Sequence, residues 1–264
     1  MIGIYRALLL ASFQSASQYR VTMFLYLLFS IIRPVIFLAA WTAVAAARGG
    51  TVGGFSAADF AMYYAIVTLV AHLVTSWNAY EFEFEVQHGR LSPKLLRPMH
   101  PLHQWIAENL VWKAFTLPVM LPVIVAIAVT FNARFTAEPW QVMLFVPSLL
   151  LGAAIQFLWN WIVATAAFWT TRVNAVTTLS DRLGFMFAGL VAPLALLPEP
   201  LHTIAYALPF ASMIGIPAEI LRGGLTPSDV LARLALQGVW LVLCFAGYQA
   251  VWRLGLRQYS AVGA

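Results

Sequence analysis

Long apolar segments, separated by shorter polar ones, dominate this sequence. Six of them reach the roughly 20 residues that a helix needs to cross the hydrocarbon core of a bilayer. These six predicted spans cover residues 21–47, 57–77, 106–131, 140–169, 173–197 and 230–254. A polar interruption at Asp181 and Arg182 weakens the fifth span. The pattern predicts an all-α integral membrane protein with six transmembrane helices.

The first 20 residues follow a different pattern. Ile4, Leu8 and Ala11 recur at helical spacing, while Arg6 and Gln14 supply polarity. We expect residues 1–20 to form an amphipathic helix that lies on the membrane surface. No internal repeat or long linker divides the rest, so we expect a single transmembrane domain over residues 1–264.

The connection between the second and third predicted spans is unusually long. In residues 80–97, three glutamates come first and three basic residues follow, an order that suits the dipole of a short surface helix. A strand is also compatible with the alternation of Glu and Phe, but it would have no sheet partner. A solvated loop that only fixes the topology is the other alternative. The many apolar residues in this segment favour docking against a partner.

Residues 198–224, between the fifth and sixth predicted spans, are apolar but broken by prolines. Pro198, Pro200, Pro209 and Pro217 divide the segment into pieces too short to span a bilayer. Non-helical backbone at membrane depth must be buried in protein or face a water-filled cavity. We therefore expect two short re-entrant helices on the outer side, broken near Pro209.

Composition excludes a soluble protein and leaves no room for a soluble catalytic domain. Of the 264 residues, 62% are hydrophobic and 9% are charged, against roughly 25% charged in an average soluble domain. The net charge of +5 reflects basic loops rather than nucleic-acid binding. Eight basic residues fall on the side of the termini and four on the opposite side. This bias predicts that both termini are cytoplasmic.

Motifs that carry chemistry are absent from the sequence. It contains no GxxxxGK[ST], HExxH, CxxC or GxSxG, and its five histidines are too scattered to suggest a metal site. We therefore expect neither an enzyme nor a bound metal. Polar residues inside the predicted spans either pair between helices or line a substrate pathway. These residues are Arg33, Gln156, Asn160, Asp181 and Arg182.

Four segments resemble the membrane subunit of a bacterial ABC transporter, in the type-2 exporter family. They are IIRPVIF in the first span, HGRLSPKLLRPMHP with its G-x-L-x-x-x-LLRP spacing, the proline-broken LPEPLHTIAYALPFASMIGIPAEILRGG, and the C-terminal WRLGLRQYSAVGA. The resemblance implies a half-transporter of the bacterial inner membrane. A second six-span permease, identical or paralogous, would complete the pathway, and two separate ATPase subunits would bind ATP and Mg²⁺.

The same resemblance implies that residues 80–97 hold the coupling helix that docks on the ATPase. Its glutamates would pair with basic residues of the ATPase, and its phenylalanines and leucines would fill a groove. The implied coupling residues are Glu81, Phe82, Glu83, Phe84, Glu85, Arg90, Leu91, Lys94, Leu95 and Arg97. The expected function is ATP-driven export of a hydrophobic or amphiphilic substrate.

Two other functions remain as alternatives. A stand-alone secondary transporter would normally have more spans or an inverted repeat, with ionisable groups at broken helices near the midplane. A lipid-modifying membrane enzyme would need clustered acids or histidines, which the sequence lacks.

Overall fold

The computed structural model describes residues 2–18, 20–76, 78–170 and 173–259. Three predicted features lie partly outside this range. The helix predicted over residues 1–20 includes residues 1 and 19, and the second predicted span ends at Trp77. The last five residues of the C-terminal WRLGLRQYSAVGA segment also lie outside it.

Helices make up nearly all of the described secondary structure, and one two-stranded hairpin accompanies them. In chain order, the elements are α1 (Ile2–Gln18), α2 (Arg20–Ala47), β1 (Thr51–Val52), β2 (Phe55–Ser56), α3 (Ala57–Val74), α4 (Asn78–Gln87), α5 (Leu91–Leu95), α6 (Leu102–Thr130), α7 (Pro139–Ala164), η1 (Thr165–Phe168), α8 (Asn174–Phe187), η2 (Leu194–Leu196), α9 (Glu199–Ala207), η3 (Ala211–Gly215), α10 (Ile216–Arg222) and α11 (Pro227–Gln258). The antiparallel hairpin pairs Thr51 with Ser56 and Val52 with Phe55.

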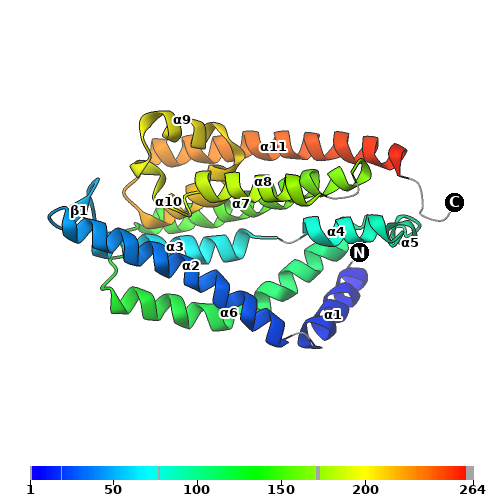
Figure 1. Cartoon of the computed structure of the whole chain (residues 1–264), viewed down its shortest axis with the longest axis horizontal. Helices are drawn as coiled ribbons and strands as arrows, with labels where there is room; N and C mark the ends of the chain where they lie inside the picture. The colour runs from blue at the N-terminus through cyan, green and yellow to red at the C-terminus, as the bar shows by residue number, and fades with distance from the viewer. Residues whose placement is uncertain (1, 19, 77, 171–172, 260–264) are drawn as a thin grey trace.

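The long helices run roughly along one axis of an elongated bundle (Figure 1). α7 packs against α11, α3 and α10, and α3 also packs against α2 and α6. α4 and α5 lie at one end of the bundle, whereas the hairpin, α9 and α10 lie at the other (Figure 1). α1 crosses at a steep angle and packs on α6. The predicted N-terminal helix is therefore present, and its position on a membrane surface stays a prediction.

Five of the six predicted spans are confirmed as helices long and apolar enough to cross a membrane. Their bounds are Leu25–Ala47, Ala57–Val74, Leu102–Thr130, Pro139–Phe168 and Pro227–Gln258. Side-chain caps fix two of the starts. Ser56 and Asp59 form a capping box at α3, and Thr226 and Asp229 form one at α11. The class of protein is therefore an all-α, multi-pass membrane protein.

The prediction of a continuous fifth span over residues 173–197 is wrong. α8 has 14 residues, about 21 Å at 1.5 Å per residue, which is shorter than a hydrocarbon core of about 30 Å. The helix ends at Phe187, and Gly189 then takes a left-handed φ of 83°. A side chain at this glycine would meet the Tyr63 hydroxyl at 2.6 Å, so glycine is needed for the close approach.

The irregular segment after α8 has its backbone carbonyls satisfied by side chains of α2 and α3. Tyr63 Oη donates to Gly189 O at 2.6 Å. Tyr64 Oη and Trp41 Nε1 both donate to Val191 O, at 2.7 Å and 2.8 Å. These bonds meet the requirement that non-helical backbone at membrane depth be paired with protein groups.

The predicted break in the segment 198–224 is confirmed. The helical stretches Glu199–Ala207 and Ala211–Arg222 are bent by 81° relative to each other. The second stretch begins with η3, a π-helix, which is an irregularity common at functional positions of helices. The outer-side location of these helices stays a prediction.

Candidate functional site

A cavity of about 530 Å³ lies between α2, α7 and α8, next to the junction of α3 and α4. All five polar residues that the sequence singles out within the spans line this one cavity. They are Arg33 from α2, Gln156 and Asn160 from α7, and Asp181 and Arg182 from α8. The fold thus collects residues that are up to 149 positions apart in the sequence.

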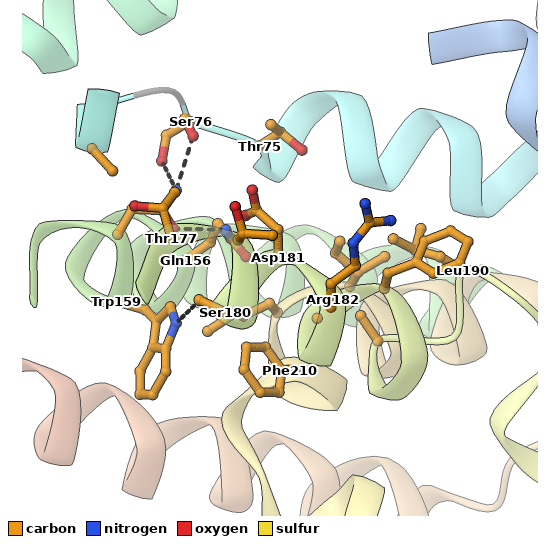
Figure 2. A pocket seen from close by; sticks show the side chains of 18 of the residues that line it. Thr75, Ser76, Gln156, Trp159, Thr177, Ser180, Asp181, Arg182, Leu190 and Phe210 are labelled. Atoms are coloured by element: carbon orange, nitrogen blue, oxygen red, sulfur yellow. Dashed lines mark hydrogen bonds between the residues drawn. The ribbon is translucent and has the colours of Figure 1, made fainter. Parts of the chain in front are cut away.

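Hydrogen bonds fasten one wall of the cavity to the junction of α3 and α4. Asn160 Nδ2 donates to Ser76 O at 2.8 Å and to Ser76 Oγ at 2.9 Å. Gln156 Nε2 donates to Asn160 Oδ1 at 3.2 Å. From α6, Asn109 Nδ2 donates to Thr75 O at 3.2 Å. Two backbone carbonyls just after α3 are therefore paired with amides from α6 and α7. Figure 2 shows the two bonds at Ser76.

α8 contributes both charged and neutral hydrogen-bonding side chains to the cavity. Figure 2 shows Asp181 and Arg182 extending from α8 towards the side of Thr75 and Ser76. Ser180 points the other way and accepts a hydrogen bond of 2.8 Å from Trp159 Nε1. The cavity therefore combines charged and hydrogen-bonding groups with flat apolar surfaces, as ligand pockets commonly do.

Arg33 packs on an aromatic ring at the edge of the cavity. Its guanidinium carbon lies 5.2 Å from the centroid of Phe185, and Phe37 lies 5.7 Å from the same ring. A cation–π contact of this kind holds an arginine in place while its N–H groups stay available. The side chains of Arg33 and Arg182 are both exposed, so the cavity opens between α2 and α8.

The predicted coupling segment consists of two short helices, α4 and α5, joined by a turn at Gly89. Phe82 of α4 is 0% exposed and lies at the centre of an aromatic cluster. Ring centroids at 5.3–6.0 Å surround it, from Trp105, Trp161, Phe168 and Trp252. These four residues belong to α6, α7, η1 and α11, so α4 is packed against four other elements.

The burial of α4 and α5 corrects part of the predicted coupling surface. Phe82 and Leu91 are 0% exposed within this chain, so they fill its own core and not a groove on a partner. Lys94 forms an ion pair with Glu85, and its ammonium also lies 5.4 Å from the centroid of the Trp105 ring. Glu85 and Lys94 therefore join α4 to α5 within this chain.

Five exposed residues of this segment form what we term the coupling face: Glu81, Phe84, Arg90, Leu96 and Arg97. The exposed ring of Phe84 lies under the guanidinium of Arg90, at 5.0 Å. Of the other predicted coupling residues, Glu83 and Leu95 are half-buried. Desolvation, together with the carboxylates of Glu108 and Glu85, raises the pKa of Glu81 to about 7, although its side chain keeps an accessible surface.

Both chain ends contact the surroundings of the coupling segment. Tyr5 Oη of α1 lies 2.5 Å from His103 Nδ1, and Tyr259 Oη lies 2.9 Å from Ser92 Oγ. One contact also comes from within α11, where Tyr248 Oη lies 2.9 Å from His100 Nε2. The ends of the described chain are therefore at the same end of the bundle as α4 and α5.

A buried polar network that the sequence interpretation missed ties α7 and α11 to the broken helices. Gln237 is 0% exposed, and its Nε2 donates to Ser148 O at 3.0 Å and to Ser212 O at 2.8 Å. Ser148 Oγ donates to Gln237 Oε1 at 2.8 Å. The sequence does contain a clue to this network: Gln237 lies within an apolar predicted span, where a polar side chain must find hydrogen-bond partners in the bundle.

Among the residues that the structure describes, no group of three or more His, Cys, Asp or Glu is placed to hold a metal ion. The long apolar helices, with broken helices and a polar cavity among them, define a multi-pass membrane protein with an internal polar site.

Comparison with known families agrees with this class. Residues 31–263 match the family described as "ABC-2 family transporter protein". The match spans nearly the whole chain, so the protein belongs to the ABC-2 family of ABC transporter membrane subunits. Members of this family are membrane components of transporters, not enzymes, and the family implies association with ABC ATPase subunits. No curated protein matches the chain.

Proposed function

We propose that the protein is the permease subunit of an ATP-driven exporter that moves a hydrophobic or amphiphilic substrate across the bacterial inner membrane. Two ATPase subunits, which bind ATP and Mg²⁺, dock on the cytoplasmic side, where both termini lie. A second six-span permease, identical or paralogous, completes the pathway. Family membership supports this proposal, together with the absence of a phosphate-binding motif from this sequence.

One observation carries the proposal: a single short segment joins the coupling face to the cavity. Thr75, Ser76 and Ala79 line the cavity. Phe82, one helical turn beyond Ala79, is buried in the aromatic cluster, and Phe84 is exposed on the coupling face. A force applied to the exposed side of α4 is therefore delivered directly to the cavity wall.

The aromatic cluster determines which elements move with α4. Because protein interiors are close-packed, α4 cannot shift without displacing the rings that surround Phe82. Those rings belong to α6, α7, η1 and α11. In this mechanism, closure of the ATPase dimer moves α4 and these helices together, and the cavity changes its access from one side of the membrane to the other.

Purification of the intact complex from native membranes in mild detergent tests the proposal. We expect a subunit that carries the GxxxxGK[ST] motif to co-purify and to hydrolyse ATP. Phe84→Ala and Arg90→Glu on the coupling face should each remove that subunit, while the permease stays folded. Phe135→Ala is a matched control, because its ring is also exposed but lies in the loop before α7, away from α4. Substrate transport driven by an ion gradient without ATP would contradict the proposal.

A further inference from the structure

We infer that the cavity between α2, α7 and α8 binds an amphiphile with an anionic head group, and that this is the substrate class of the transporter. The inference deepens the proposed function and rests on it for the link to transport. The binding site itself is argued from the residues that line the cavity.

The charge of the cavity favours an anion. Among the described residues, two guanidinium groups, from Arg33 and Arg182, and one carboxylate, from Asp181, line it, which gives a formal charge of +1. Neither of the ion pairs found among the described residues involves Arg33 or Arg182. Guanidinium groups bind phosphate and carboxylate through paired, charge-assisted hydrogen bonds.

Neutral hydrogen-bonding groups extend this anion site. Thr177, Thr178 and Gln156 line the same cavity as the two arginines. The Thr178 hydroxyl and the second N–H of the Gln156 amide can bond the uncharged polar atoms of a head group, such as ester or hydroxyl oxygens. The Thr177 hydroxyl donates to Val173 O at 3.2 Å, so it can only accept a hydrogen bond from a ligand. The polar side of the cavity is therefore suited to a whole head group and not only to a single charge.

Apolar surface next to the charges suits an attached hydrocarbon chain. Trp159, Phe185 and Phe210 line the cavity together with Leu190 and Met213. The volume of about 530 Å³ lies within the range of roughly 300–1,000 Å³ that is typical of small-molecule sites. A head group and the first part of a chain fit that volume.

The outer face of α8 provides a path for the rest of a long chain. Val176 and Leu179 are 43% and 61% exposed, and Met186 is 53% exposed. These residues follow helical spacing on the side of α8 away from Thr177 and Asp181. A chain that leaves the opening between α2 and α8 would meet this apolar face. A purely water-soluble anion would gain nothing from it.

Photocrosslinking tests the inference on the full-length chain in nanodiscs of phosphatidylcholine, without any ATPase. The probe is phosphatidic acid with a photoreactive group in one acyl chain, titrated to half-maximal crosslinking of α2 and α8 peptides. Arg33→Gln combined with Arg182→Gln should weaken binding by about tenfold or more, the scale set by losing charge-assisted hydrogen bonds. Arg48→Gln combined with Arg134→Gln is the control, since these exposed arginines do not line the cavity.

A second variant should strengthen the binding of phosphatidic acid, whereas a misfolded protein would only lose it. Asp181→Asn removes the only carboxylate that lines the cavity in the described part of the chain, so binding of phosphatidic acid should tighten several-fold. Two results would overturn the inference. One is equal binding of a phosphatidylcholine probe, and the other is competition by free glycerol phosphate as strong as competition by the lipid. Because no ATPase is present, these results are independent of whether the ATPase docks on α4.

Discussion

Asn160 donates two hydrogen bonds to Ser76, one to its carbonyl at 2.8 Å and one to its hydroxyl at 2.9 Å. This contact joins the middle of the bundle to the first residues before the coupling helix. It also ties a cavity-lining amide of α7 to the segment before α4, the helix that would carry the force from an ATPase.

Replacing Asn160 should separate ATP hydrolysis from transport. Asn160→Leu leaves the Ser76 carbonyl without its amide partner, at a cost of about 1–3 kcal/mol for a buried polar group. We expect the ATPase to stay bound, because the coupling face is unchanged, while transport per ATP hydrolysed falls. Asn174→Leu is the control, since Asn174 is exposed at the start of α8. Equal transport by both variants would show that the contact does not transmit motion.

Phe82 and Phe84 should have opposite phenotypes although they are two residues apart. Phe82→Ala empties the centre of the aromatic cluster and should destabilise the protein by about 3–5 kcal/mol. Phe84→Ala removes an exposed ring and should change stability by less than about 1 kcal/mol, but it should abolish ATPase binding. Thermal unfolding in detergent and co-purification measure the two effects. If both variants still bound the ATPase, α4 would be excluded as the docking element.

Gly152 should not tolerate a side chain. A Cβ there would lie 2.3 Å from Met213 O, a backbone atom of η3. Gly152→Ala must therefore push α7 away from the broken helices, with an expected loss of about 1–3 kcal/mol and of transport. Gly238→Ala is the control, because nothing lies within 4 Å of a Cβ at that position of α11. That variant should be neutral or slightly more stable, since alanine favours helix.

Glu81 should make the stability of the protein depend on pH. Its pKa is raised from 4.5 to about 7, so the folded protein holds a proton that the unfolded chain releases at lower pH. The stabilising contribution is full below about pH 4.5 and is lost as pH rises through about 7. Glu81→Gln should flatten the fall in melting temperature between pH 5 and pH 8. Glu199→Gln, at the opposite end of the bundle, should keep it. An unchanged slope in Glu81→Gln would contradict this assignment.

Hydropathy predicted five helices well because membrane spans need long uninterrupted apolar runs. It failed at the fifth span because the end of α8 depends on tertiary contacts. Gly189 is fixed by the hydroxyl of Tyr63, which is 126 residues away in the sequence. No periodicity within residues 173–197 carries that information.

The candidate site was predicted as separate residues and not as a cavity. Charged and amide groups within apolar spans are conspicuous in a sequence, but their meeting point depends on how the helices pack. The split between Phe82 and Phe84 was accessible in principle. Residues two apart on a helix point about 200° apart, so one of the two had to face away from the bundle. Treating the segment as one surface concealed this difference.

The central claim is that α4 transmits the motion of an ATPase to the cavity. Its most direct test measures the distance between spin labels at Gln87 on α4 and Val176 on α8, with Cys244 replaced by alanine, in the complex in nanodiscs. We predict that trapping the ATPase with ATP and vanadate shifts the distance distribution, and that Asn160→Leu reduces the shift. An unchanged distribution in a complex that hydrolyses ATP would contradict the claim.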